Sequence, residues 1–173
     1  RCDHEQKCGY HFTPRDYFEQ NPAEKEKFSE TTFRSYACVK EAQPVATSYI
    51  DLNIVNQSLR GYPANKLFQF LSAQFGEAET LKLMKKYKVG TSKYWDGATV
   101  FWQTDNQGRV RTGKIMLYNS ETGKRVKEPY NHVTWVHSVL HKGNYNLKQC
   151  FFGEHLLSEN KNRPVALVES EKT

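Results

Sequence analysis

The chain has 173 residues, a mean hydropathy of −0.79 and 13% aromatic residues, which is typical of one polar, aromatic-rich globular domain with a small appendage. No uninterrupted apolar run exceeds four residues, whereas a transmembrane helix needs about 20 and a signal peptide about 7–15, so we expect neither membrane insertion nor secretion. Lys and Arg outnumber Asp and Glu by 25 to 19, and this net charge of +6 favours a polyanionic partner. Four cysteines are fewer than small secreted disulfide scaffolds carry, so we expect a cytoplasmic protein in which Cys38 and Cys150 are buried thiols.

The first 12 residues concentrate the ligand types that zinc prefers. Cys2 and Cys8 supply thiolates, and His4 and His11 lie close to them in the sequence. A structural zinc site normally takes its four ligands from two knuckles, and no Cys-x-x-Cys follows. Three interpretations stay open: residues 1–12 are half of a zinc ribbon, the two Cys and two His close a site alone, or the segment binds no metal. In none of them is the zinc catalytic.

Residues 13–47 are predicted to be a connector that contains a short helix. Thr13 is a good N-cap residue, and Pro14 suits the first helical turn that follows it. Between about 22 and 48 no apolar period persists for long, which is typical of an irregular segment with at most one further helical turn.

A helical region is predicted over residues 48–87. Ser48 is placed to cap a helix of about ten residues, which ends at the breaker Gly61-Tyr62-Pro63. A second helix ends at Gly76, and a third covers about 77–87 with its apolar residues on one face and its lysines on another. The last two helices are expected to form a hairpin with one basic flank.

The apolar period changes from 3.6 to 2 after Gly90, which indicates β-strands. Residues 99–103 and 110–118 are rich in β-branched and aromatic side chains, and residues 105–108 have the composition of a hairpin turn. Residues 124–149 are expected to add another strand or a short helix. The predicted fold class is therefore α+β, with a helical region beside a twisted antiparallel sheet.

The last part of the sequence offers a candidate catalytic carboxylate. Residues 153–157 are predicted to be helical, and the apolar run 164–168 is interpreted as a buried strand. Glu169 follows this strand at its carboxyl end, a position from which carboxylates of α/β proteins often reach a metal or a substrate. One carboxylate does not hold Mg²⁺ by itself, and the alternative is an exposed glutamate without such a role.

Cations and aromatic rings interleave along the predicted hairpin. Arg109 and Arg111 are two residues apart on a strand and should leave the same face, with Lys114 on the opposite one. A site for single-stranded nucleic acid needs cations for phosphates and rings for bases. The alternative is an ordinary solvated face with the rings in the core. The candidate groups of the hairpin and the turn after it are Arg109, Arg111, Lys114, Lys124, Arg125, Lys127, Phe101, Trp102 and Tyr118.

Three segments, in this order, resemble the bacterial replicative primase (DnaG-type) family and its relatives on phages and mobile elements. Residues 1–12 look like the second half of a primase zinc ribbon, and residues 97–110 are similar to the hairpin that opens the primase core. Residues 164–173 resemble the first strand of a Toprim domain, with Glu169 as its glutamate. The motif His141-Lys142-Gly143 is similar to a basic motif that precedes that domain.

The resemblance implies a role for particular residues. It implies zinc ligation by Cys2 and Cys8, template contact near Arg109 and Lys142, and a catalytic or metal-organising role for Glu169. It also implies a primase-core-like domain over residues 48–162 and the first strand of a truncated Toprim domain over residues 163–173. Ser170 stands where the family usually has glycine, and the paired metal-holding aspartates of Toprim are expected beyond Thr173.

The resemblance implies that an intact parent is a bacterial, cytoplasmic DNA primase. Such a protein carries structural zinc, uses Mg²⁺ or Mn²⁺ to synthesise primers on single-stranded DNA, and has a replicative helicase as a partner. This chain alone is expected to bind single-stranded nucleic acid without polymerising nucleotides. The competing hypothesis is a non-enzymatic DNA- or protein-binding module of a mobile element.

Overall fold

The computed structural model describes residues 12–26, 45–140, 143–159, 162 and 164–172, in two units, residues 1–44 and 45–173. In the first unit, helix α2 (Pro14–Gln20) begins after Thr13, as predicted. The Thr13 hydroxyl accepts a hydrogen bond from Asp16 N at 3.2 Å, and the Asp16 carboxylate accepts one from Thr13 N at 2.7 Å. These reciprocal bonds form a capping box, which satisfies two backbone donors that the start of a helix leaves unpaired. A helical stretch over residues 22–26 follows.

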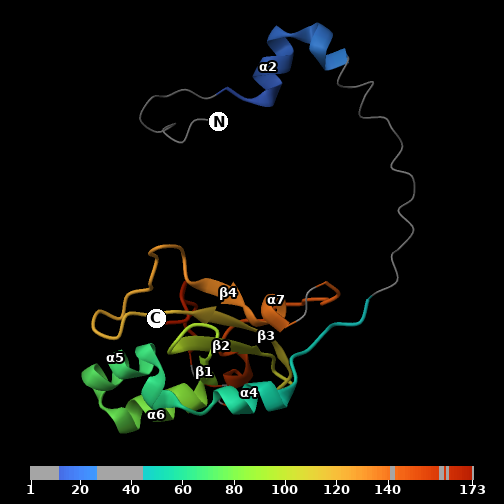
Figure 1. Cartoon of the computed structure of the whole chain (residues 1–173). Coiled ribbons are helices and arrows are strands. Elements are labelled where there is room, and N and C mark those ends of the chain that lie inside the picture. Colours follow the sequence, from blue (N-terminus) through green and yellow to red (C-terminus); the bar gives the residue numbers. More distant parts are fainter. Residues whose placement is uncertain (1–11, 27–44, 141–142, 160–161, 163, 173) are drawn as a thin grey trace. The chain divides into compact units, whose positions relative to one another are not determined.

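The second unit begins with helices, and the predicted helix hairpin is confirmed. Helix α5 (Lys66–Phe75) ends at Gly76, and helix α6 (Glu77–Lys86) packs against it. They follow helix α4 (Leu52–Ser58) and the short 3-10 helix η1 (Tyr62–Ala64). Figure 1 shows α5 and α6 side by side, next to the sheet.

The predicted cap of the first of these helices is wrong. Helix α4 is seven residues long, and its N-cap is Asp51, whose side chain accepts a hydrogen bond from Asn53 N at 2.8 Å. Ser48 is instead paired with Asn146: its N donates to Asn146 O, and its Oγ accepts from Asn146 N, each at 3.0 Å. The hydroxyl of Ser48 is thus used by a contact 98 residues away in the chain.

Four antiparallel strands form one sheet in the order β1-β2-β3-β4. The predicted hairpin is confirmed as β2 (Ala98–Thr104) and β3 (Val110–Met116), whereas the edge strand β1 (Val89–Ser92) was not predicted. The ambiguous region 124–149 contains both expected alternatives, because strand β4 (Val133–Trp135) continues directly into helix α7 (Val136–Leu140). The fold class is therefore α+β, as the sequence predicts.

Helices cover both faces of this sheet, which leaves no solvated face in the middle of the β2–β3 hairpin. On one face Val55 of α4 and Val136 of α7 pack with Val100 and Trp102. On the other face the helices α5 and α6 pack against Phe101, Met116 and Tyr118. The predicted stacking rings Phe101, Trp102 and Tyr118 are only 2%, 1% and 3% exposed, so the prediction that they contact bases is wrong.

A buried asparagine joins the helix hairpin to the sheet. Asn65 is fully buried and caps α5, since its Oδ1 accepts a hydrogen bond from Phe68 N at 3.1 Å. The same oxygen accepts from Thr99 Oγ1 at 2.9 Å, and Nδ2 donates to Gly90 O at 3.1 Å. One side chain thus fixes the start of a helix to two strands.

The C-terminal segment differs from the prediction. The helical expectation for residues 153–157 is met by a short 3-10 helix, η2 (Glu154–Leu156). Residues 164–168 form no strand, and the side chains of Val165 and Leu167 are 72% and 83% exposed. An apolar run of this length does not by itself specify burial, and here no strand pairs with it.

The C-terminal segment contacts the sheet near its end, where Glu171 binds Lys114 and Lys172 Nζ donates to Gly123 O. Within the described ranges, no helix has the length and apolar character needed to span a membrane.

Candidate nucleic-acid interface

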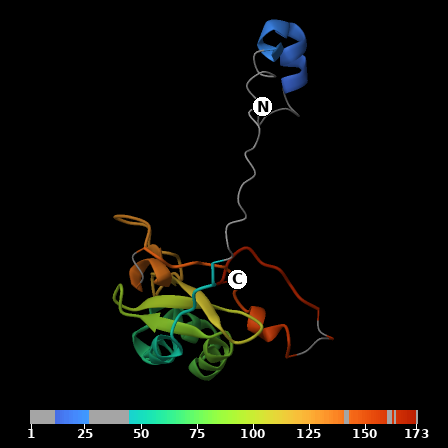
Figure 2. The same cartoon turned by 90° about the vertical axis from the view of Figure 1, so that its right-hand side faces the viewer.

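The connections between strands leave the sheet at two opposite ends. Ser92 pairs with Ala98, and Met116 pairs with Val133, so the β1–β2 loop and the β3–β4 connection share one end, which we name the loop end. The β2–β3 turn leaves the other end, which we name the turn end. Because a seven-residue strand rises roughly 3.3 Å per residue, the two ends are about 20 Å apart. Figure 2 shows this sheet from a second direction.

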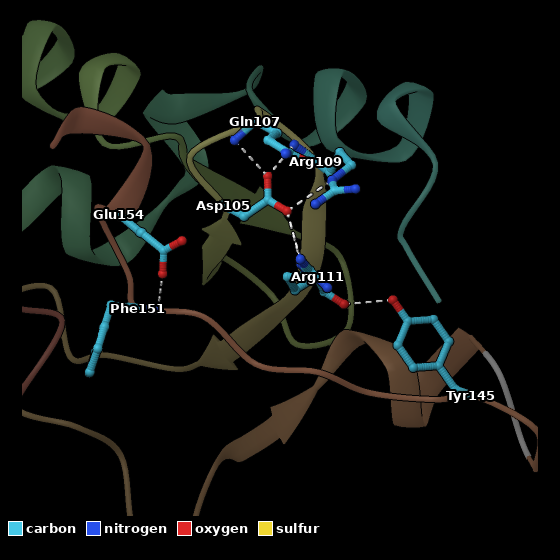
Figure 3. Close-up of polar contacts among 7 residues, drawn as sticks. All are labelled: Asp105, Gln107, Arg109, Arg111, Tyr145, Phe151 and Glu154. Atoms are coloured by element: carbon cyan, nitrogen blue, oxygen red, sulfur yellow. Dashed lines mark hydrogen bonds and ion pairs between the residues drawn. The ribbon is translucent and has the colours of Figure 1, made fainter. Parts of the chain in front are cut away.

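The two predicted arginines meet at the turn end on one carboxylate (Figure 3). Asp105 is 2% exposed, and its Oδ2 accepts hydrogen bonds from Arg109 Nε and Arg111 Nε, each at 3.0 Å. Its Oδ1 accepts from the backbone nitrogens of Gln107 and Arg109, at 3.0 and 2.9 Å. The expectation that both arginines leave the sheet together is therefore met, but the structure adds a buried acid between them.

The electrostatics of the turn end follow from this arrangement. Burial raises the pKa of Asp105, but the hydrogen bonds from Arg109 and Gln107 and the charge of Arg109 outweigh it, so the pKa is lowered overall. Both guanidinium carbons also lie 4.9 Å from the centre of the Tyr49 ring. Arg111 occupies a β-bulge, and its carbonyl accepts a hydrogen bond from Tyr145 at 2.6 Å.

The two arginines are consequently not equivalent as phosphate ligands. The side chain of Arg111 is 11% exposed, and that of Arg109 is 44% exposed. A phosphate reaches Arg109 from solvent, whereas the guanidinium of Arg111 mainly compensates the buried carboxylate. Of these two arginines, Arg109 is therefore the one accessible to a phosphate.

The other predicted cations are distributed over the molecule. Lys114 forms an ion pair with Glu171 at 2.9 Å, on the face of the sheet that also carries Phe101. Lys124 and Arg125 are exposed and lie in the β3–β4 connection at the loop end. Lys142, Cys2, Cys8 and Cys38 lie outside the described residues.

Sequence reasoning missed a group of rings at the loop end. Tyr130 stacks on His132, with ring centres 4.4 Å apart and planes at 19°. Trp95 meets the edge of His132 at 5.1 Å, and Tyr94 meets Trp95 at 4.7 Å. Tyr94 is 51% exposed and Tyr130 is 56% exposed, whereas His132 is 8% exposed. We call Tyr94, Trp95, Tyr130 and His132 the aromatic cluster.

Cations surround the aromatic cluster in the sequence. The two loops that carry it also hold four exposed cations and three exposed acids, which are Lys93, Lys124, Arg125, Lys127, Asp96, Glu121 and Glu128. The backbone of His132 is fixed by Val126, because His132 N donates to Val126 O at 3.2 Å. A signal for this site was present in the sequence: Tyr94 and Tyr130 fall outside any strand period, Tyr130 directly after Pro129 and Tyr94 three residues before Gly97, and Pro and Gly mark loops.

The predicted catalytic residue Glu169 lies on another part of the unit. It lines an open hollow of about 580 Å³ between the sheet, residues 149–154 and the C-terminal segment. Cys150, which also lines the hollow, is half-buried, and its pKa is raised to about 11 by burial and then by Glu154. Among the residues that the structure describes, no three Cys, His, Asp or Glu side chains are grouped to hold a metal ion.

Comparisons with known proteins identify two segments. Residues 1–23 match a family described as a zinc beta-ribbon finger, so the first of the three interpretations of the Cys-rich segment agrees with this match. Residues 65–173 match a family described as a domain of unknown function (DUF6371). Neither description names a primase, and no curated protein and no solved structure matches the chain. Because the second match spans more than half of the sequence, the chain belongs to the DUF6371 family.

Proposed function

We propose that the second unit binds single-stranded nucleic acid at the loop end, where bases stack on the aromatic cluster. The observation that carries the proposal is the stack of Tyr130 on His132. His132 is buried and packs against one face of the Tyr130 ring, while 56% of Tyr130 remains exposed. A flat base on the open side of Tyr130 would extend this stack by one ring, and such stacking contributes about 1–3 kcal/mol per base.

The distribution of charge supports a polyanionic ligand for this unit. Residues 45–173 carry 18 Lys and Arg against 11 Asp and Glu, a net charge of +7. Residues 1–44 carry 7 against 8, a net charge of −1. The excess positive charge of the chain thus resides in the unit that carries the aromatic cluster. Phosphate contacts from Lys93, Lys124, Arg125 and Lys127 at the loop end would supply affinity without base specificity.

Single strands are favoured over duplexes by the chemistry of the exposed rings. Tyr94 and Tyr130 offer flat apolar surface, and a base can reach such a surface only when its own face is not covered by neighbours in a helix. Arg109, about 20 Å away at the turn end, is a candidate for a further phosphate contact of a longer strand.

The finer proposal is that the chain is part of a primase-like protein of a bacterial replication system. The zinc-ribbon match at residues 1–23 supports it, because the resemblance to primases places such a ribbon ahead of the core. In that proposal Cys2 and Cys8 bind structural zinc, and Glu169 takes part in a Mg²⁺ or Mn²⁺ site for primer synthesis, next to a replicative helicase. The alternative is a non-enzymatic DNA- or protein-binding module, for which the aromatic cluster and the basic charge suffice.

Binding is tested by fluorescence anisotropy with a labelled 15-nucleotide single strand and the matching duplex, over a series of salt concentrations. We expect the single strand to bind more tightly, and Tyr130→Leu and Tyr94→Leu each to weaken it by roughly fivefold or more. The matched control is Phe75→Leu, because Phe75 is 66% exposed at the opposite end of α5 from the loop end. Wild-type affinity in both tyrosine variants, or equal affinity for the duplex, would refute the proposed interface.

The contribution of the cations is tested in the same assay. The double change Lys93→Gln with Lys127→Gln removes two phosphate contacts, so the slope of log K against log [salt] should become shallower by about 1.4 for a single strand. Lys82→Gln with Lys85→Gln, which changes two exposed lysines of α6, serves as the charge-matched control. For the finer proposal, a longer protein that carries these residues together with the paired aspartates of a Toprim domain should make primers from a template, nucleotides and Mg²⁺ or Mn²⁺. Glu169→Gln should abolish this synthesis, and the absence of primers from the longer protein leaves the binding-module alternative as the better account.

A further inference from the structure

The hollow beside Glu169 has the size and lining of a small-molecule site. Its volume of about 580 Å³ lies within the range of roughly 300–1,000 Å³ that ligand pockets occupy. Three aromatic residues line it, together with three carboxylates. These residues are Trp135, Phe151, Phe152, Glu154, Glu169 and Glu171. An acidic, aromatic hollow on a unit whose net charge is positive indicates a ligand different from nucleic acid.

Two residues that line the hollow, Glu171 and Trp135, already hold the ammonium group of Lys114 and show how another would be held. Lys114 Nζ lies 2.9 and 3.2 Å from the two carboxylate oxygens of Glu171. The same nitrogen lies 5.9 Å from the centre of the Trp135 ring, which is a cation–π distance. Carboxylate and ring together therefore stabilise an ammonium at this place. Lys114 compensates Glu171, and two further carboxylates remain.

Several hydrogen-bond acceptors around the hollow have few or no partners among the described residues. Glu169 makes no hydrogen bond or ion pair with any described residue, and the carboxylate of Glu154 accepts one bond, from Phe151 N at 3.1 Å. The side-chain oxygen of Gln103, which also lines the hollow, is buried and accepts no hydrogen bond within the described part of the chain. The raised pKa of the Cys150 thiol, due first to burial and then to Glu154, agrees with a negative potential in this region. A ligand that brings N–H donors and positive charge would satisfy these groups.

We propose that this hollow binds an organic cation that carries an aliphatic primary ammonium. A bare divalent metal would need several converging oxygen ligands, and no three acidic, Cys or His groups come together for a metal among the described residues. A primary ammonium needs less: one or two carboxylates for its three N–H groups and aromatic faces for its methylene chain. The ammonium belongs to a free diamine or to a lysine side chain of another protein. The proposal is independent of the nucleic-acid interface, which lies at the loop end.

The test is a titration of the full chain, followed by NMR of backbone amides and indole N–H groups. The probes are 1,5-diaminopentane and its neutral analogue 1,5-pentanediol, and N-acetyl-lysine methylamide with its norleucine analogue. We expect saturable shifts at the Trp135 indole and the Glu169 amide with the ammonium probes, and at least tenfold weaker binding of the neutral ones. Glu169→Gln and Glu154→Gln should each weaken the diamine about two- to fivefold. Glu121→Gln, an exposed glutamate outside the hollow, is the matched control and should change nothing.

Each outcome decides the proposal. Tighter binding of the diamine identifies a free polyamine-type ligand, and tighter binding of the lysine compound identifies a protein lysine. Equal affinity for the diol and the diamine overturns the proposal, as do shifts that map outside the hollow or the absence of saturation below about 10 mM. Tyr130→Leu should leave diamine binding unchanged, so failure here and failure of the nucleic-acid interface are distinguished.

Discussion

Replacing Asp105 by asparagine isolates the charge of one buried carboxylate. Asparagine keeps the Oδ1 acceptor for the backbone nitrogens of Gln107 and Arg109, so the turn itself retains its two hydrogen bonds. The substitution removes the negative charge that lies against the guanidinium groups of Arg109 and Arg111, which are 44% and 11% exposed. The unit would then hold a largely buried guanidinium without its counter-ion.

The magnitude follows from these exposures. Removing one partner of a buried ion pair costs about 3–5 kcal/mol, which applies to Arg111, whereas a surface pair contributes about 0–1 kcal/mol, which applies to Arg109. The amide of asparagine recovers part of this by a neutral hydrogen bond. We therefore expect Asp105→Asn to lower the free energy of unfolding by about 3 kcal/mol at pH 7. With a urea dependence of about 2 kcal/mol per molar, the midpoint should fall by about 1.5 M.

The same reasoning fixes the pH dependence. The pKa of Asp105 is lowered in the folded protein, so its carboxylate stabilises the fold above its unfolded pKa of about 3.9 and ceases to do so as the pH falls through the folded value. The difference between wild type and variant should be complete at pH 7 and should shrink below about pH 4. Urea unfolding followed by tryptophan fluorescence at several pH values measures it.

The control is Asp96→Asn, because the Asp96 side chain is 99% exposed and its contact with Lys66 is 4.0 Å long. We expect this variant to lie within about 0.5 kcal/mol of wild type. If Asp105→Asn also stays within that range at pH 7, or if its deficit is the same at pH 3 and pH 7, the assignment of a stabilising buried ion pair is refuted.

Two substitutions probe the core, and one labelling experiment probes the thiol of Cys150. Asn65→Ala removes the cap of α5 and leaves the Gly90 carbonyl without its side-chain donor. The free energy of unfolding, measured in urea, should therefore fall by about 2–4 kcal/mol. A decrease below about 1 kcal/mol would contradict the role of this side chain. Gly113→Ala places a Cβ 2.7 Å from the Trp102 ring. The free energy of unfolding should fall by about 1–3 kcal/mol, and the near-UV circular dichroism spectrum should change. An unchanged spectrum and an unchanged urea midpoint would show that the ring moves freely. Burial and then Glu154 raise the pKa of the Cys150 thiol to about 11. The rate at which iodoacetamide alkylates Cys150 in the folded protein, measured by mass spectrometry of the peptide that contains it, should therefore rise about tenfold per pH unit from pH 8 to 10. A rate that has already reached its plateau at pH 8 would contradict a neutral thiol.

The elements with strong local signals were predicted, and those decided by distant contacts were not. Helices α5 and α6 carry a sustained apolar period, and Asp105 to Gly108 form a compact turn that a short segment specifies by itself. Ser48 is predicted to cap α4 because serine is a good cap residue, but aspartate is one too, and only the contact of Ser48 with Asn146 decides in favour of Asp51. Strand β1 has the sequence Val-Gly-Thr-Ser, which is too short and too polar to show a period.

The predicted role of the rings is wrong for one physical reason, whereas the role of the predicted cations in binding stays a prediction. A period of two places alternate residues on opposite faces but does not say whether a face is covered. Helices cover both faces here, so Phe101 and Trp102 are buried on opposite sides of the same strand. The sequence predicts Asp105 only as a turn residue, whereas the folded turn brings both arginines onto its carboxylate and makes it their counter-ion. Tyr94 and Tyr130 are brought together by strand register, which no local pattern reports.

The packing of α4 implies that the family match and the folding unit start at different residues. The match starts at Asn65, yet Ile50 and Val55 are 3% and 2% exposed and belong to the same core as Trp102. The indole nitrogen of Trp102 donates to Ser58 Oγ at 2.8 Å. A chain that began at Asn65 would therefore expose apolar side chains on one face of the sheet. Residues 45–64 bury this face within the same chain, and relatives must either have an equivalent segment or bury the face in another way.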